Sequence, residues 1–114
     1  MNGVRPLAST NPKTGEVWYA DLGMISKNRP VLVLYSPLHN DARNLLIVAP
    51  LTSQIKSMRG EVPLGQVSWL PKISAVNLQG IASLHPKWLV RKMGVCTSEQ
   101  MQKVKHALRE LLDL

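Results

Sequence analysis

The sequence has few of the residues on which many functional classes depend. Its 114 residues include one cysteine, which excludes a disulfide framework and every cysteine-rich zinc module. No apolar run approaches the ~18 residues that a membrane span requires. The first residues lack the apolar core of a secretory signal peptide. We therefore expect one soluble, cytoplasmic domain that needs no metal or other cofactor.

Familiar catalytic signatures are also missing. Neither GxGxxG nor GxxxxGK[ST] occurs, which excludes nucleotide-binding loops of those kinds. His39, His85 and His106 are far apart in the sequence, so none has a partner at a metal-ligand spacing. Cys96 adjoins an expected helix, and we interpret it as a small buried residue rather than a reactive thiol.

Positive charge, by contrast, is in excess. The chain has 14 Lys+Arg against 7 Asp+Glu, which gives a net charge of +7. Residues 27–96 hold nine cations and two acids, and nine minus two accounts for the whole excess. Most of these cations are expected on loops between strands, where they could form a positive cleft. A basic domain of this kind is expected to bind polyanions, although solubility is an alternative reason for the charge.

The hydrophobic pattern predicts a small α+β domain. Apolar runs or alternation predict strands at residues 16–21, 30–35, 45–51, 61–64, 66–70 and 74–84, with a further short strand near residue 95. Pro50 is expected to end or bulge its strand, because proline cannot donate to a ladder. Residues 1–14 lack periodicity, so we expect a flexible tail followed by one domain of residues 15–114.

The end of the chain predicts one amphipathic helix. Thr97 and Gln100 fit a capping box. Apolar residues follow at helical spacing: Met101, Val104, Ala107, Leu108, Leu111 and Leu112. This stripe is expected to pack against a mostly antiparallel sheet, and the short connections favour a curled sheet or barrel.

Two polar residues stand at the ends of the most apolar strands. Arg29 comes directly before residues 30–35, and Thr52 comes directly after residues 45–51. If those strands are neighbours, both side chains reach the same cleft. The arginine fork and the hydroxyl could then bind a phosphodiester and stabilise the charge of its transition state. An arginine and a threonine at strand ends are also ordinary surface residues.

Three segments in order, GEVWYADL, NRPVLVLYS and VAPLTSQI, resemble the MazF/PemK family of endoribonuclease toxins. A late strand with a glutamine, VNLQGIASL, also matches, and the resemblance covers about residues 14–112. It implies a small SH3-like curled antiparallel β-barrel of the CcdB/MazF type with a C-terminal helix. It further implies a homodimer, and a small acidic antitoxin as the partner.

The resemblance also implies a reaction and its residues. Single-stranded RNA is cut without metal by attack of the ribose 2′-OH, which leaves a 2′,3′-cyclic phosphate and a 5′-OH. The catalytic arginine and threonine of the family match Arg29 and Thr52. The RNA-contacting positions match Tyr19, Ser53, Gln54 and Gln79, and Lys56 and Arg59 follow in a loop where they suit backbone phosphates. Tyr19 suits base stacking, with a core aromatic as the alternative.

Two departures from the family pattern keep other functions open. The connection at residues 22–28 is short and has neither Glu nor Gln, and Leu78 stands where many members have an acid. Because arginine keeps its proton in proteins, no residue is assigned to accept the proton of the 2′-OH. One alternative is therefore a non-catalytic nucleic-acid-binding module on the same fold. A gyrase-poisoning toxin of the CcdB type is another, but that family relies on a Trp-Gly end and this chain ends in LRELLDL.

Overall fold

The computed structural model describes residues 11–22 and 28–114. The strands in this part of the chain are β1 (Glu16–Ala20), β2 (Arg29–Tyr35), β3 (Leu46–Thr52), β4 (Glu61–Gly65), β5 (Ser74–Asn77), β6 (Ala82–Leu84) and β7 (Leu89–Val95). Two short 3-10 turns, η2 (Leu78–Gly80) and η3 (Pro86–Trp88), precede β6 and β7, and the helix α1 (Ser98–Leu112) ends the chain.

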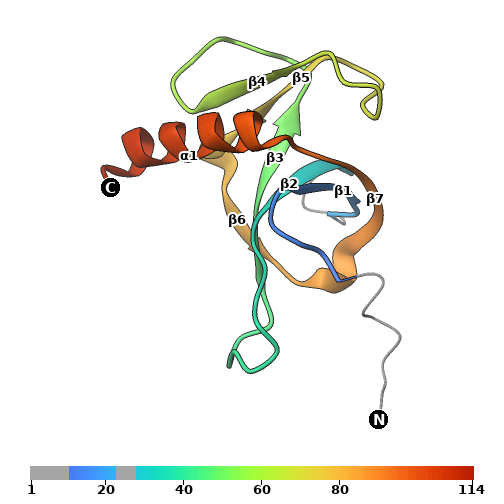
Figure 1. The fold of residues 1–114 in the computed structure, drawn as a ribbon. Helices are drawn as coiled ribbons and strands as arrows, with labels where there is room; N and C mark the ends of the chain where they lie inside the picture. Colours follow the sequence, from blue (N-terminus) through green and yellow to red (C-terminus); the bar gives the residue numbers. More distant parts are fainter. Residues whose placement is uncertain (1–10, 23–27) are drawn as a thin grey trace.

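The strands form one curled antiparallel sheet with α1 beside it (Figure 1). Their order is β4-β5-β3-β2-β1-β7, and β6 pairs with β3. The predicted α+β class, antiparallel sheet and terminal helix are confirmed. The expected closure into a barrel is not found in the described part of the chain, because no ladder joins β4 to β7 and the path of paired strands stays open.

Alternating residues of the curled sheet supply two apolar clusters. One cluster contains Val17, Leu32 and Leu51, and the α1 stripe packs against it through buried Val104. The other cluster lies on the opposite face of the strands: Trp18, Ala20, Val31, Val33, Leu46 and Val48. The predicted helical stripe is confirmed apart from Leu112, which is half exposed. The predicted capping box of Thr97 and Gln100 is present.

Three details of the predicted strands are wrong. Residues 66–70 form a turn, in which the backbone N–H of Leu70 donates to the carbonyl of Val67. Residues 74–84 are not one strand, because η2 separates β5 from β6 and each pairs with a different stretch of β3. Finally, β3 continues through Pro50 to Thr52.

Pro50 is tolerated because it lies where β3 changes partner. The residues before it pair with β6, and the residues after it pair with β5. Gly80 of the intervening turn lies so close that a Cβ atom there would stand 2.8 Å from Cγ of Pro50. On the edge of β3 that pairs with β5 and β6, the ladder is thus interrupted at Pro50 in any case. The backbone N–H that proline lacks therefore costs the sheet little stability.

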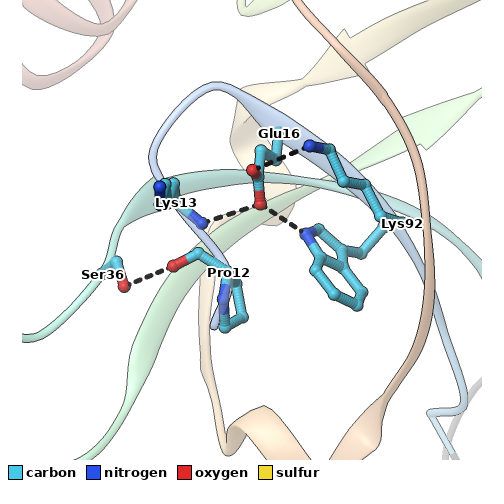
Figure 2. A network of polar contacts seen from close by, with 6 residues as sticks. Pro12, Lys13, Glu16, Ser36 and Lys92 are labelled. Atoms are coloured by element: carbon cyan, nitrogen blue, oxygen red, sulfur yellow. Dashed lines mark hydrogen bonds and ion pairs between the residues drawn. The ribbon is translucent and has the colours of Figure 1, made fainter. Parts of the chain in front are cut away.

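A buried carboxylate anchors the start of the domain (Figure 2). Oε1 of Glu16 accepts hydrogen bonds from Nε1 of Trp18 and from the backbone N–H of Lys13, both at 2.9 Å. Its Oε2 lies 3.1 Å from Nζ of Lys92 on β7. Ser36 also donates to the carbonyl of Pro12, at 2.7 Å. Residues 12–16 are thereby attached to Ser36, directly after β2, and to β7, whereas residues 1–10 of the expected tail lie outside the described residues.

Glu16 is expected to make stability fall in acid. Burial raises its pKa, but the hydrogen bonds from Trp18 and Lys13 and the ammonium of Lys92 together lower it below the ordinary value of 4.5. A carboxyl with a lowered folded pKa stabilises the fold above its unfolded pKa, and this stabilisation is lost as the pH falls through the folded value. Glu16→Gln should therefore be less stable than wild type at pH 7, with a difference that shrinks below about pH 4.5.

Urea unfolding of both proteins at a series of pH values measures that difference. Glu99→Gln, which removes an exposed carboxylate from α1, is the matched control. A Glu16→Gln difference that stays constant from pH 7 to about pH 3 would contradict the role of the ionised carboxylate.

Candidate functional site

The register of the two central strands brings Arg29 and Thr52 together. Val31 of β2 pairs with Pro50 of β3 in an antiparallel ladder. When this register is continued by two residues, Arg29 at the start of β2 stands opposite Thr52 at the end of β3. Residues two apart in a strand share a face, so both side chains leave the sheet on the same side. Opposite residues in such a ladder have Cα atoms about 5 Å apart.

A cleft of about 520 Å³ opens at this end of the sheet. Its walls come from the start of β2, the end of β3 with the loop after it, and the segment that leads into β5. The lining residues are Asn28, Arg29, Pro30, Leu51, Thr52, Ser53, Gln54, Leu70, Pro71, Lys72 and Ser74. The structure thus brings four of the sequence-predicted site residues into one cleft.

The Arg29 side chain is half-buried and has free hydrogen-bonding capacity. Its Nε is buried and has no hydrogen-bond partner among the described residues. An unpaired buried donor typically costs about 1–3 kcal/mol of folding free energy. This unpaired donor therefore does not stabilise the fold, and Arg29 lines a cleft where an anionic ligand could pair with it.

Thr52 is held by the turn that follows β3. Its Oγ1 accepts a hydrogen bond from the backbone N–H of Gln54 at 3.1 Å. Because a hydroxyl has one proton and two lone pairs, this bond leaves the proton of Thr52 free to be donated to a ligand. The side chains of Ser53 and Gln54 are exposed beside it.

The described lining of the cleft carries positive charge only. Arg29 and Lys72 are its charged residues, and this lining includes no carboxylate and no imidazole. The two cations, together with the hydroxyl of Thr52, suit the binding of a phosphodiester. The sequence analysis counted Lys72 among the loop cations of residues 27–96 but did not name it as a site residue, because no local pattern places residue 72 beside β2 and β3.

The other four predicted residues lie outside the described lining. Nη2 of Arg59 donates to the carbonyl of Glu110 at 3.0 Å, and Nε2 of Gln79 donates to the carbonyl of Arg59 at 3.2 Å. These two side chains therefore connect η2, the loop before β4 and the end of α1. Lys56 is exposed in that loop. Tyr19 lies on β1, opposite Pro30 of the cleft wall.

Thiol and metal chemistry find no support in the described residues. Burial raises the pKa of the Cys96 thiol to about 11, so a reactive thiolate is not formed near neutral pH. Within residues 11–22 and 28–114, no group of three His, Cys, Asp or Glu side chains could hold a metal ion. No helix in the same residues is long and apolar enough to cross a membrane.

Comparison with known sequences identifies one family. The model of the PemK-like, MazF-like toxin of type II toxin–antitoxin systems matches residues 13–112. The chain is 33% identical over 103 residues to the probable endoribonuclease MazF5 of Mycobacterium tuberculosis, which covers 90% of this chain and 94% of that protein. It is also 33% identical over 108 residues to the endoribonuclease MazF2 of Mycobacterium bovis, a match that covers 87% of this chain and 95% of that protein.

Solved structures show the same fold. A mycobacterial endoribonuclease in complex with its cognate antitoxin matches with a TM-score of 0.77 and 26% identity, over 90% of this chain and 96% of that one. The Mycobacterium tuberculosis toxin MazF-mt6 matches with a TM-score of 0.75 and 26% identity, over 87% and 97%. Both similarities cover at least 87% of this chain.

Proposed function

The chain belongs to the PemK-like, MazF-like family of toxins from type II toxin–antitoxin systems, and we propose that it cleaves single-stranded RNA at the cleft that Arg29 and Thr52 line. The observation that carries this proposal is the position of these two side chains on neighbouring strands in a cleft whose charged lining is cationic. The pairing of an arginine with a hydroxyl donor at one site supports a nuclease over a non-catalytic module, and the curated relatives are themselves named endoribonucleases.

The proposed reaction is a transesterification within the RNA. The 2′-OH gives its proton to water as its oxygen attacks the adjacent phosphorus, and the bond to the 5′-oxygen breaks. The leaving oxygen takes a proton from water, so that a 2′,3′-cyclic phosphate and a 5′-OH end are formed. Arg29 pairs with the phosphate oxygens and neutralises the charge that grows on them, and Thr52 donates its proton to one of them. Ser53 and Gln54, next to Thr52, are proposed to contact neighbouring nucleotides and contribute to sequence selection.

Incubation of the purified protein with a long single-stranded RNA in EDTA tests this function. Discrete fragments whose 5′ ends accept a phosphate from polynucleotide kinase without prior dephosphorylation would support it. RNA that is retained but uncut would instead support the non-catalytic module. Cleavage that EDTA abolishes would overturn the metal-independent mechanism.

An acidic antitoxin is proposed as the protein partner. A relative of known structure is a mycobacterial endoribonuclease in complex with its cognate antitoxin. The net charge of +7 would attract an acidic chain and accelerate its association.

We also propose a cytoplasmic homodimer, since apolar side chains such as Ile47, Val90 and Leu114 are exposed in one copy. Sedimentation should then give about twice 12.7 kDa, and a value near 12.7 kDa at micromolar concentration would contradict it.

RNA binding is expected to weaken steeply with salt, since each contacted phosphate releases counterions. Lys72 lines the cleft, so Lys72→Ala should reduce the slope of log affinity against log salt by about 0.7, the value for one phosphate contact on a single strand. Lys56→Ala should act in the same way if the loop after β3 also follows the RNA backbone.

Titration of labelled RNA between about 50 and 200 mM salt measures the slope. Lys103→Ala, an exposed lysine on α1, is the matched control and should leave it unchanged. A flat dependence for wild type would show that the excess charge serves solubility only.

A further inference from the structure

A row of three residues leads across the sheet away from the cleft. Tyr19 of β1 stands opposite Pro30 of β2 on one side and opposite Arg91 of β7 on the other. Opposite residues in antiparallel ladders point to the same face, so the three side chains share one surface. Pro30 itself lines the cleft, and Arg91 lies two strand spacings away, at about 10 Å.

Arg91 and Tyr19 form a cation–π contact on this surface. The guanidinium carbon of Arg91 lies over the tyrosine ring, 5.4 Å from its centroid. Tyr19 is half-buried, whereas Arg91 is exposed. The ring thus supports the guanidinium from below and leaves the outer surface of Arg91 accessible.

No acid in the described residues competes for this guanidinium. The adjacent Lys92 stands opposite Trp18 instead of Tyr19, and forms the ion pair with Glu16. The structure records no ion pair for Arg91 within the residues described. A planar cation that a ring supports, with no neutralising carboxylate, has a free face for a flat, electron-rich ligand.

We propose that Arg91, held in place by Tyr19, is a stacking site for one unpaired RNA base on the surface that begins at Pro30 in the cleft wall. The inference rests on the proposed function, because it takes RNA as the ligand. Unpaired bases stack on aromatic side chains and on guanidinium planes, and both are combined here. Arg91 is then the residue that touches the base, and Tyr19 acts beneath it as a positioning residue rather than as the direct stacking partner.

A scan with abasic nucleotides tests the stacking site. Short single-stranded RNA oligonucleotides carry one abasic residue at each position in turn, and a 2′-deoxy nucleotide at the mapped cleavage position prevents attack. Affinities of wild type, Arg91→Ala and Arg91→Lys are measured by fluorescence anisotropy. Arg43→Ala serves as the matched control, because Arg43 is exposed in the connection between β2 and β3.

Arg91→Ala is expected to weaken binding of the intact oligonucleotide about tenfold, within the range for one stacked base. This loss should nearly disappear when one particular position is abasic. Arg91→Lys should show the same base-dependent loss with an unchanged salt slope, since lysine keeps the charge but not the planar group. Tyr19→Leu should resemble Arg91→Ala, whereas Tyr19→Phe, which retains the ring, should bind like wild type.

Two results would overturn the stacking site. One is an unchanged affinity of Arg91→Ala, and the other is a loss of equal size at every abasic position, which would identify a phosphate contact. The nuclease proposal is tested independently of the stacking site. If wild type binds but does not cut RNA, the scan needs no 2′-deoxy nucleotide and a base-dependent loss would still support the stacking site. Cleavage by wild type together with a uniform loss would overturn the stacking site alone.

Discussion

Arg29→Ala is expected to slow RNA cleavage about 100–1000-fold, which corresponds to about 3–4 kcal/mol of transition-state stabilisation. The reason is the position of the guanidinium, which is half-buried in the cleft with Nε unpaired and which meets a phosphate that gains negative charge during attack. Arg29→Lys should recover only part of the rate, because an ammonium cannot form two parallel hydrogen bonds to the phosphate. Single-turnover cleavage in EDTA measures these rates.

The same substitution should leave the fold intact. Removal of a buried donor that has no partner relieves a cost, so the melting temperature of Arg29→Ala should equal or exceed that of wild type. Arg43→Ala is the matched control, as an exposed arginine outside the cleft lining, and should cut at the wild-type rate. If Arg29→Ala cut RNA at the wild-type rate, this result would contradict the proposed site and favour the non-catalytic module.

Loss of the Thr52 hydroxyl is the second large expected effect. Thr52→Val keeps the shape of the side chain but removes the donor, and we expect a decrease of about 100-fold in the cleavage rate. Thr52→Ser should retain much of the activity, since it keeps both the proton and the oxygen that accepts from the backbone of Gln54. The effect should fall on the rate of the bound complex more than on RNA affinity, because the hydroxyl acts on the charge of the transition state.

Thr52→Val also removes the hydrogen bond within the turn, so its stability should be measured in parallel. That bond is expected to contribute about 1 kcal/mol, far less than the loss in rate. In the double variant with Arg29→Ala, the losses should be less than additive, since both groups act on one phosphate. Equal rates for Thr52→Val and Thr52→Ser would contradict a role for the hydroxyl.

Much of the fold could be predicted from local pattern. Alternation and apolar runs predicted strands at residues 16–21, 30–35 and 45–51, each within one residue of the observed bounds, because burial of one or both faces requires such patterns. The capping box and the 3.6-residue period located α1. Residues 66–70 were misassigned, since a short apolar run fits a packed turn as well as a strand. Here Trp69 packs so closely on β7 that a Cβ atom at Gly94 would lie 2.2 Å from its ring.

The sequence by itself determined which polar residues stand at the ends of the buried strands, and thus the candidates Arg29 and Thr52. Only the tertiary structure decided that they face each other, because this depends on the register between β2 and β3. It also decided that Lys72 joins their cleft and that Arg91 lies over Tyr19. It decided further that Arg59 donates to a carbonyl of α1 and that Gln79 donates to the carbonyl of Arg59. Strand pairing joins residues far apart in the chain, and local hydrophobic periodicity carries no information about which of them become neighbours.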